Sequence, residues 1–243
     1  MQEGVPADFG PSLSTCSVFQ GHGEQVLTGA GEFLCARLAR IVRDQGQAVL
    51  GVPGGRSVAR VFQVLAAHDL DWQRVHVFLL DERCVPVGDP ESNYGLVQEH
   101  LITPLHERGT RPGSVHPFAY NAASADQGAQ QYTTELAAYG LRFDVLLASM
   151  GEDGHVASLF PRHAALGVAE RCFVHVHDAP KPPPARISAS LPLLRTAQVV
   201  ALVVLGQAKA AAFAALGDPL VAVTDCPAKA LLDTQECVVF TDC

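Results

Sequence analysis

Short, continuously apolar segments alternate along this chain with segments of helical periodicity. The apolar segments, each long enough for one strand, are residues 48–52, 75–80, 144–148 and 199–204. Uninterrupted apolar runs of this length indicate strands buried on both faces, which is typical of parallel sheets covered by helices. Helical patterns are predicted beside them, over residues 23–43, 58–67, 93–101, 125–139 and 208–216, and a short helix is expected directly after His155. The alternation predicts an α/β fold, a three-layer sandwich with a mostly parallel sheet, and residues 238–240 are expected to add a last edge strand.

The length of the chain and the spacing of these segments indicate one domain. The chain has 243 residues, and α/β folds of this length often form a single domain. Residues 1–15 mix glycine, proline, serine and acidic residues without periodicity. We therefore expect a flexible N-terminal segment, followed by one α/β domain over residues 16–243. The Pro-rich stretch 180–184 is expected to be a loop within that domain, because the alternation of strands and helices continues beyond it.

Charge and cysteine usage argue against several classes of partner. The formal net charge is −8 and no basic run occurs, so neither nucleic acid nor an anionic membrane is an expected partner. No apolar run reaches the roughly 18 residues that a membrane-spanning helix needs, and no secretory signal is visible. The seven cysteines are widely spaced without a CxxC pair, which favours reduced thiols in the cytoplasm over a zinc site or a disulfide framework. The sequence leaves both a monomer and a homodimer open.

Polar clusters directly follow four of the predicted strands. They are Gly54–Ser57, Asp81–Arg83, Gly151–His155 and Gly206–Lys209. In parallel sheets, ligands bind outside the carboxyl ends of the strands, where the direction of winding switches. We therefore expect these four loops to line one crevice.

The first cluster, Gly54-Gly55-Arg56-Ser57, lies between a strand and a helix. Paired glycines let backbone N–H groups approach an anion, and a helix N-terminus adds partial positive charge. The Arg56 side chain and the Ser57 hydroxyl would add donors. The segment fits neither a GxGxxG nor a Walker A pattern, which argues against dinucleotides and P-loop nucleotides. Phosphate binding and an ordinary tight turn are both compatible with it.

Further charged residues would converge on the same crevice. Asp81 to Arg83 offers a carboxylate that orients the site and an arginine that binds an anion or stabilises an oxyanion. The alternative is a salt-bridged surface turn. Lys209 falls in the first turn of a predicted helix, where the helix dipole favours anions and a cation is not expected. The position makes sense if the helix and the lysine share an anionic ligand. Arg186 follows the Pro-rich loop, and both it and Lys209 would otherwise be solvated.

The most informative cluster is Gly151-Glu152-Asp153-Gly154-His155. Imidazole suits general-base chemistry near neutral pH, and a neighbouring carboxylate such as Asp153 can fix its tautomer. No other histidine or cysteine lies at metal-ligand spacing, so a metal site is not expected. Ser158 follows shortly after, but the GxSxG pattern of an exposed nucleophile is absent. The alternative for His155 is a capping or solvated residue.

Several longer motifs together resemble the 6-phosphogluconolactonase family. The most specific is MGEDGHVASLFP over residues 150–161, preceded by FDVLL at 143–147, which is similar to the family's FDxxxxGMGxDGHxASLFP element. DERCVP at 81–86 and SN at 92–93 resemble its DERxVP…SN element. The other matches, in family order, are GGRS at 54–57, RIS at 186–188 and Gly206 to Lys209. The departures from the usual pattern are Pro53, Val58, Ser149 and Ser188.

The resemblance implies a fold shared with glucosamine-6-phosphate deaminases and ribose-5-phosphate isomerases. It implies hydrolysis of 6-phosphogluconolactone to 6-phosphogluconate in the pentose phosphate pathway, without metal or cofactor. His155 would then deprotonate the attacking water, Asp153 would position that base or shape its loop, and Arg83 would stabilise negative charge on the substrate or oxyanion. The residues expected to hold phosphate and sugar are Gly54, Gly55, Arg56, Ser57, Asp81, Ser158, Arg186 and Lys209.

Two other functions are compatible with parts of the pattern. Deaminases of amino sugar phosphates typically continue DGHxAFNEP, with a further carboxylate after the histidine, whereas Val156 to Phe160 contains no Glu. A sugar-phosphate sensor from a transcription regulator would carry a DNA-binding module, and no basic helix-turn-helix pattern precedes the first strand. Ammonia release from glucosamine 6-phosphate would favour the first function. Tight binding of 6-phosphogluconate without turnover would favour the second.

Overall fold

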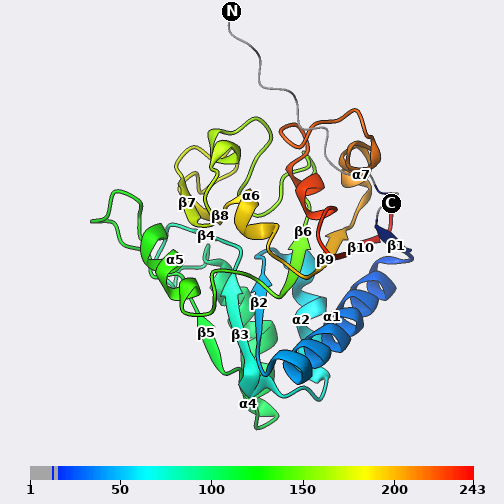
Figure 1. Ribbon diagram of the computed structural model, residues 1–243, viewed down its shortest axis with the longest axis vertical. Coiled ribbons are helices and arrows are strands. Elements are labelled where there is room, and N and C mark those ends of the chain that lie inside the picture. The colour runs from blue at the N-terminus through cyan, green and yellow to red at the C-terminus, as the bar shows by residue number, and fades with distance from the viewer. Residues whose placement is uncertain (1–12, 14–15) are drawn as a thin grey trace, which may run out of the picture.

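A parallel seven-stranded sheet forms the centre of the computed structural model, which describes residue 13 and residues 16–243 (Figure 1). Its strands are β1 (Ser17–Gln20), β2 (Ala48–Val52), β3 (Val75–Leu79), β5 (Ser114–His116), β6 (Val145–Ser149), β9 (Val199–Val204) and β10 (Glu236–Thr241). They lie in the order β1-β10-β9-β6-β2-β3-β5, and every neighbouring pair is parallel. The predicted mostly parallel α/β fold is confirmed. The N-terminal segment 1–15, predicted to be flexible, lies outside the described residues apart from Leu13.

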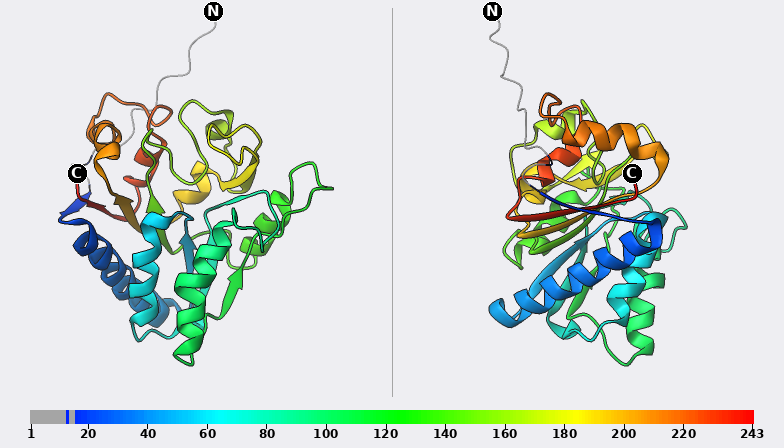
Figure 2. Two further views of the ribbon diagram at one scale, coloured as in Figure 1. Left: turned by 180° about the vertical axis from the view of Figure 1, so that it is seen from behind. Right: turned by 90° about the vertical axis from the view of Figure 1, so that its right-hand side faces the viewer.

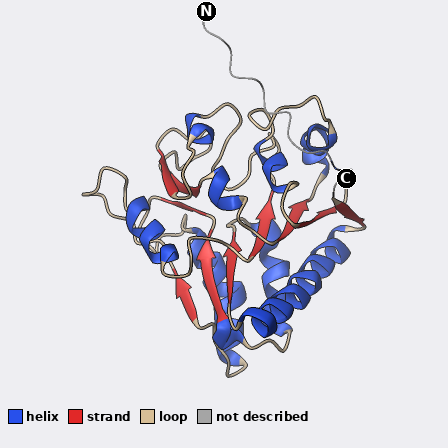
Figure 3. Cartoon of the chain, in the orientation of Figure 1, coloured by secondary structure: helices blue, strands red, loops and turns tan. Residues whose placement is uncertain are grey.

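Helices of very different length connect these strands (Figure 3). The α-helices are α1 (Gly23–Gln45), α2 (Ala59–Ala67), α3 (Asn93–Val97), α4 (Thr103–Glu107), α5 (Ala129–Ala137), α6 (Leu191–Leu194) and α7 (Ala210–Gly217). A π-helical turn, η4 (Gln98–Ile102), joins α3 to α4. Short 3-10 segments are η2 (Arg56–Val58), η3 (Trp72–Arg74), η5 (Ala164–Gly167), η6 (Gln207–Lys209) and η7 (Pro227–Leu231). Among the described residues, no helix is long and apolar enough to cross a membrane.

Both faces of the large sheet are buried, as its continuously apolar strands predict. Leu50 on β2 packs into one hydrophobic cluster and Val49 into the other, and Val77 and Phe78 on β3 alternate in the same way. Helices α1, α2 and α4 contribute to the cluster on one face, and α5, α6 and α7 to the cluster on the other. Figure 2 shows α1 and α2 lying together on one side of the sheet. The predicted three-layer arrangement follows from this two-sided burial.

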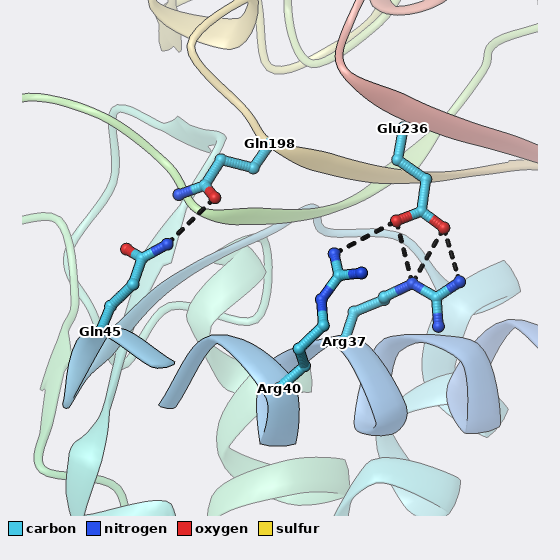
Figure 4. A network of polar contacts seen from close by, with 5 residues as sticks. All are labelled: Arg37, Arg40, Gln45, Gln198 and Glu236. Carbon is cyan, nitrogen blue, oxygen red and sulfur yellow. Dashed lines mark hydrogen bonds and ion pairs between the residues drawn. The ribbon is translucent and has the colours of Figure 1, made fainter. Parts of the chain in front are cut away.

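The long helix α1 is fixed at its end and along its side. Gly46 ends it in the left-handed conformation, with φ +83°, as the sequence predicts. Arg37 on α1 donates to both carboxylate oxygens of Glu236 on β10, at 2.6 and 2.9 Å, and Arg40 reaches the same carboxylate (Figure 4). The hydrogen bond from Arg37 is the main reason why the pKa of Glu236 is lowered. The contact joins the N-terminal helix to a strand from the far end of the chain.

A second, antiparallel sheet lies beyond the end of β3 and was not predicted. It consists of β4 (Asp81–Arg83), β8 (Arg186–Ala189) and β7 (Phe173–Val176), in that order. Its register places Asp81 opposite Ser188 and Arg83 opposite Arg186. The segment Asp81–Arg83, predicted to be a charged loop after the strand 75–80, is therefore itself a strand that brings two parts of the candidate site together.

Three local predictions differ from the structure. The helical region predicted to end at residue 101 continues through η4 and α4 to Glu107. The short helix expected after His155 is absent, because Ala157 has φ +52° and Val156 forms isolated bridges to Met150 and Leu159. Residues 238–240 do not form an edge strand: they belong to β10, which pairs with β9 and β1. The edge on this side of the sheet is β1, whose four residues are all exposed, the apolar Val18 and Phe19 included.

Candidate active site

A cavity of about 250 Å³ lies at the carboxyl ends of β2, β6 and β9. The residues around it are Pro53, Gly54, Gly55, Ser57, Asp81, Arg83, Asn93, Ser149, Met150, Gly151, Glu152, His155, Ala157, Lys181, Arg186 and Lys209. All four predicted loops contribute residues to the wall of this cavity. The structure thus places the expected crevice where the topology of a parallel sheet predicts it.

Most of the predicted site residues line this cavity, but two of them, Asp153 and Ser158, do not. Asp153 lies behind His155 and Ser158 is fully buried, so neither forms part of the cavity wall. Arg56 begins η2, and its side chain lies outside the described part of the structure. Conversely, Lys181 and Asn93 also line the cavity, although neither was among the predicted site residues.

The His155 imidazole is held by Asp153 two residues earlier. Its Nδ1 forms a hydrogen bond with Asp153 Oδ1, and its backbone N–H donates to the same oxygen at 3.3 Å. An ionised carboxylate only accepts, so Nδ1 carries the proton and Nε2 of the neutral ring keeps a free lone pair. Partial burial opposes ionisation of Asp153, but the hydrogen bond and the charge of His155 outweigh it and lower the pKa of Asp153 to about 2. The pair has the arrangement of a general base and its orienting carboxylate.

Close packing fixes the plane of this ring. A Cβ atom on Gly151 would lie 2.0 Å from the His155 ring, so only glycine leaves room for the imidazole. On another side, Phe160 lies 4.7 Å from the ring, centroid to centroid. Gly154 has φ +85°, and a Cβ there would lie 2.9 Å from Cys226 Sγ. Both glycines of this loop therefore serve the placement of the histidine.

Asp81, Ser158 and Arg186 form a buried polar chain beneath the cavity. Ser158 Oγ donates to Asp81 Oδ2 at 2.6 Å, and Arg186 Nη1 donates to Ser158 Oγ at 3.4 Å. The Ser158 proton is used in the first of these bonds. Ser158 therefore links β4 and β8 to the loop after His155, which is a structural position rather than that of an exposed nucleophile.

Glu82 anchors β4 to the start of α3, a role that the sequence analysis missed. The carboxylate is 2% exposed and accepts hydrogen bonds from the backbone N–H of Arg83, Asn93 and Tyr94 and from the Ser92 hydroxyl, at 2.7 to 2.9 Å. Burial raises the pKa of Glu82, and these hydrogen bonds oppose that rise. A buried carboxylate with four donors stabilises the surrounding backbone.

Asn93 connects this anchor to the glycine-rich turn. Its Nδ2 donates to the Asp81 carbonyl at 2.9 Å. A Cβ on Gly54 would lie only 1.8 Å from Asn93 Oδ1, so the first glycine is required by this side chain. Gly55, the second glycine, has φ +97° and also needs glycine. The turn predicted for anion binding is thus shaped by α3 as well as by its own sequence.

Basic side chains give the cavity its charge. Arg83 Nη1 donates to the Glu91 carbonyl at 2.7 Å, while its buried Nε has no hydrogen-bond partner among the described residues. Lys209 Nζ lies 3.5 Å from Ser149 Oγ, and burial is the main reason why the pKa of Lys209 is lowered. Lys181 and Arg186 complete the set. The cavity is thus lined by four cations and one histidine against two carboxylates, Asp81 and Glu152, and this excess of positive charge suits an anionic ligand.

The described residues include no candidate metal site. Within residue 13 and residues 16–243, no group of three or more His, Cys, Asp or Glu side chains is placed to hold a metal ion. His175 and His177, which the sequence places near each other, have ring centroids 6.1 Å apart.

Comparison with known proteins gives matches over most of the chain. Residues 21–240 match the family described as glucosamine-6-phosphate isomerases/6-phosphogluconolactonase. A 6-phosphogluconolactonase of Streptomyces coelicolor is 36% identical over 209 residues, which cover 79% of this chain and 78% of that protein. A crystal structure of a 6-phosphogluconolactonase from Shewanella baltica OS155 superimposes with a TM-score of 0.78 at 25% identity, covering 93% of this chain and 95% of the other.

A human relative is much longer than this chain. The GDH/6PGL endoplasmic bifunctional protein of Homo sapiens is 39% identical over 194 residues, which are 76% of this chain. The match covers 24% of the human protein, so this chain corresponds to about a quarter of that relative's length.

Proposed function

Because the chain belongs to the family of glucosamine-6-phosphate isomerases and 6-phosphogluconolactonases, we propose that it hydrolyses 6-phospho-D-glucono-1,5-lactone to 6-phospho-D-gluconate, a step of the oxidative pentose phosphate pathway. The observation that carries this proposal is the His155–Asp153 pair at a cavity lined with basic side chains. The relatives named as 6-phosphogluconolactonases support the substrate.

The proposed reaction uses His155 twice. Nε2 takes a proton from water, and the water oxygen attacks the lactone carbonyl carbon to form a tetrahedral oxyanion. When the bond between that carbon and the ring oxygen breaks, the imidazolium returns the proton to the ring oxygen, which leaves as the sugar hydroxyl. Asp153, ionised above about pH 2, stabilises the imidazolium between these steps.

Charge on the substrate is held by the other cavity residues. Arg83 is proposed to stabilise the oxyanion or the substrate phosphate, because it lines the cavity. Backbone N–H groups of the turn at Gly54 and Gly55, the Ser57 hydroxyl and the Lys209 ammonium would bind phosphate and sugar hydroxyls. Asp81 is proposed to bind sugar from the cavity floor, where it accepts from Ser158.

The proposed setting is the cytoplasm, with a small-molecule substrate. None of the seven cysteines, all of which the structure describes, forms a disulfide, and this is compatible with a reducing compartment. Light scattering coupled to size-exclusion chromatography would distinguish the monomer from the homodimer that the sequence leaves open.

The test of this function is hydrolysis of freshly generated 6-phosphogluconolactone in the presence of a chelator, with spontaneous hydrolysis subtracted. Turnover well above background supports the proposal and shows that no free metal ion is required. Turnover at the background rate, together with ammonia release from glucosamine 6-phosphate, would replace it with a deaminase.

A further inference from the structure

Arg186 uses its guanidinium to hold the Pro-rich loop. Its Nη2 donates to the Lys181 carbonyl at 2.9 Å and to the Pro182 carbonyl at 3.3 Å, and its Nε donates to the Pro183 carbonyl at 3.0 Å. Nη1 bonds Ser158 Oγ, so each nitrogen of the group is engaged within the protein. The side chain is 6% exposed. A buried guanidinium committed in this way positions a backbone more readily than it binds a ligand.

The loop that Arg186 holds carries Lys181 to the cavity. A backbone hydrogen bond from the Ala179 N–H to the Pro184 carbonyl, at 3.0 Å, closes the loop at its base. Three consecutive prolines restrict its backbone further. The Lys181 carbonyl points back to Arg186, whereas the Lys181 side chain is exposed and lines the cavity. The loop is therefore held in one conformation by its own sequence and by a buried arginine beneath it.

Lys181 and Lys209 both line the cavity, so two ammonium groups are brought to the same small space. The Lys181 charge contributes to lowering the pKa of Lys209, although burial is the largest cause and the Glu152 carboxylate opposes it. Among the described residues, no carboxylate lies within ion-pair distance of Lys181. Two cations in one cavity repel each other, and an anion bound between them relieves that repulsion. A phosphate monoester carries up to two negative charges and would relieve this repulsion.

We propose that Lys181 is a specificity-determining residue that binds the substrate phosphate together with Lys209, and that Arg186 is the positioning residue that presents it. This inference rests on the proposed function and assigns a different role to Arg186 from the substrate contact expected from the sequence. The cation that contacts the ligand comes from the loop, and the arginine acts through that loop.

The test compares binding of 6-phosphogluconate with binding of unphosphorylated gluconate by calorimetry. Lys181→Met is expected to weaken 6-phosphogluconate binding about tenfold, the loss of one charge-assisted contact, and to leave gluconate binding unchanged. Lys181→Arg keeps the charge and is expected to retain most of the affinity. The matched control is Arg43→Met, because Arg43 is an exposed cation on α1 that pairs with Asp44. Equal affinity of Lys181→Met and wild type would overturn the proposal, as would equal losses for both ligands.

The positioning role of Arg186 is tested by non-additivity. Arg186→Lys keeps the charge but cannot make the forked contacts to three carbonyls, so it is expected to weaken 6-phosphogluconate binding as Lys181→Met does. The double variant is expected to bind no more weakly than Lys181→Met alone, because both changes remove the same contact. Additive losses would show that Arg186 contacts the ligand itself.

These binding measurements are independent of turnover. A wild-type protein that binds 6-phosphogluconate through Lys181 but does not hydrolyse the lactone would overturn the proposed function alone. A wild-type protein that binds neither ligand would overturn both proposals. Circular dichroism of every variant separates loss of binding from loss of folding.

Discussion

Among the histidines that lie beside a carboxylate, His155 and His116 have very different surroundings. His155 bonds Asp153 and faces the cavity. His116, on the edge strand β5, has its Nε2 2.7 Å from Ser114 Oγ and its Nδ1 3.6 Å from a Glu135 carboxylate oxygen. Serine, histidine and carboxylate in this order are the residue types of a serine hydrolase. By residue type alone, the second cluster would be the better candidate for a nucleophilic site.

The surroundings of Ser114 show why the second cluster is structural. Its hydroxyl also contacts His76 Nδ1 at 2.8 Å and the Tyr139 hydroxyl at 3.2 Å. A serine hydroxyl has one proton and two lone pairs, so three partners leave no lone pair for attack. The His116 ring stacks on Phe78, 4.0 Å away with 7° between the planes. The comparison teaches that a free lone pair facing a charged cavity, rather than the set of residue types, marks the candidate base.

The largest expected effect comes from changing the surroundings of His155 while leaving the histidine itself in place. Gly151→Ala places a Cβ in the space of the imidazole and is expected to displace the ring. A misplacement of about 1 Å can cost roughly a hundredfold in turnover, so we expect kcat for lactone hydrolysis to fall by about that factor. Gly167→Ala is the control, because a Cβ there meets nothing within 4 Å. Wild-type kcat in Gly151→Ala would show that ring placement is not critical.

Removing the second histidine is expected to affect stability instead of activity. His116→Ala leaves Ser114 with one partner fewer and removes the stacking on Phe78, so we expect a loss of about 1–3 kcal/mol of unfolding free energy in urea titrations. His177→Ala, at an exposed side chain, is the control and is expected to change stability by less than about 0.5 kcal/mol. A large fall in activity with unchanged stability would reverse the assignment.

We also expect the stability cost of His116→Ala to depend on pH. Burial lowers the pKa of His116, with Glu135 opposing, and burial together with His116 lowers the pKa of His76. Because the folded-state pKa lies below the unfolded value, the neutral rings contribute stability above about pH 6.5, and this contribution is lost as the pH falls. The cost of His116→Ala should therefore be smaller at pH 5 than at pH 8. An equal cost at both pH values would contradict the burial argument.

The smallest expected effect concerns the carboxylate beside His155. The lowered pKa of Asp153 means that it contributes stability above its unfolded value near pH 4, and that this is lost as the pH falls toward about 2. Carbon NMR of the Asp153 carboxyl should give a midpoint near 2 in the wild type and closer to 4 in His155→Ala. An unchanged midpoint would show that the imidazole does not hold this carboxylate.

The large sheet and the histidine loop could be predicted because their signals are local. Continuous apolar runs mark β2, β3, β6 and β9, and the polar residues after them lie at one edge by topology. The second sheet could not be predicted, because β4 and β8 are far apart in sequence and pair through a register that no local pattern encodes.

The same limit applies within the candidate site. Ser158 has the sequence signature of a site residue, yet its partner Asp81 lies 77 positions away and buries it. Lys181 gives no local signal, since its placement depends on the distant fold around Arg186. The Ser114 hydroxyl likewise contacts both His76 and His116 only because β3 and β5 are paired, and no local pattern indicates that pairing.

The most direct measurement is lactone hydrolysis by His155→Ala and His116→Ala in one assay, beside the wild type and with spontaneous hydrolysis subtracted. The account predicts that His155→Ala loses about 10²–10⁴-fold in kcat, the usual contribution of a general base, while His116→Ala stays within about twofold of the wild type. Wild-type turnover by His155→Ala, or equal losses in both variants, would contradict the claim that the cavity and Asp153 make His155 the base.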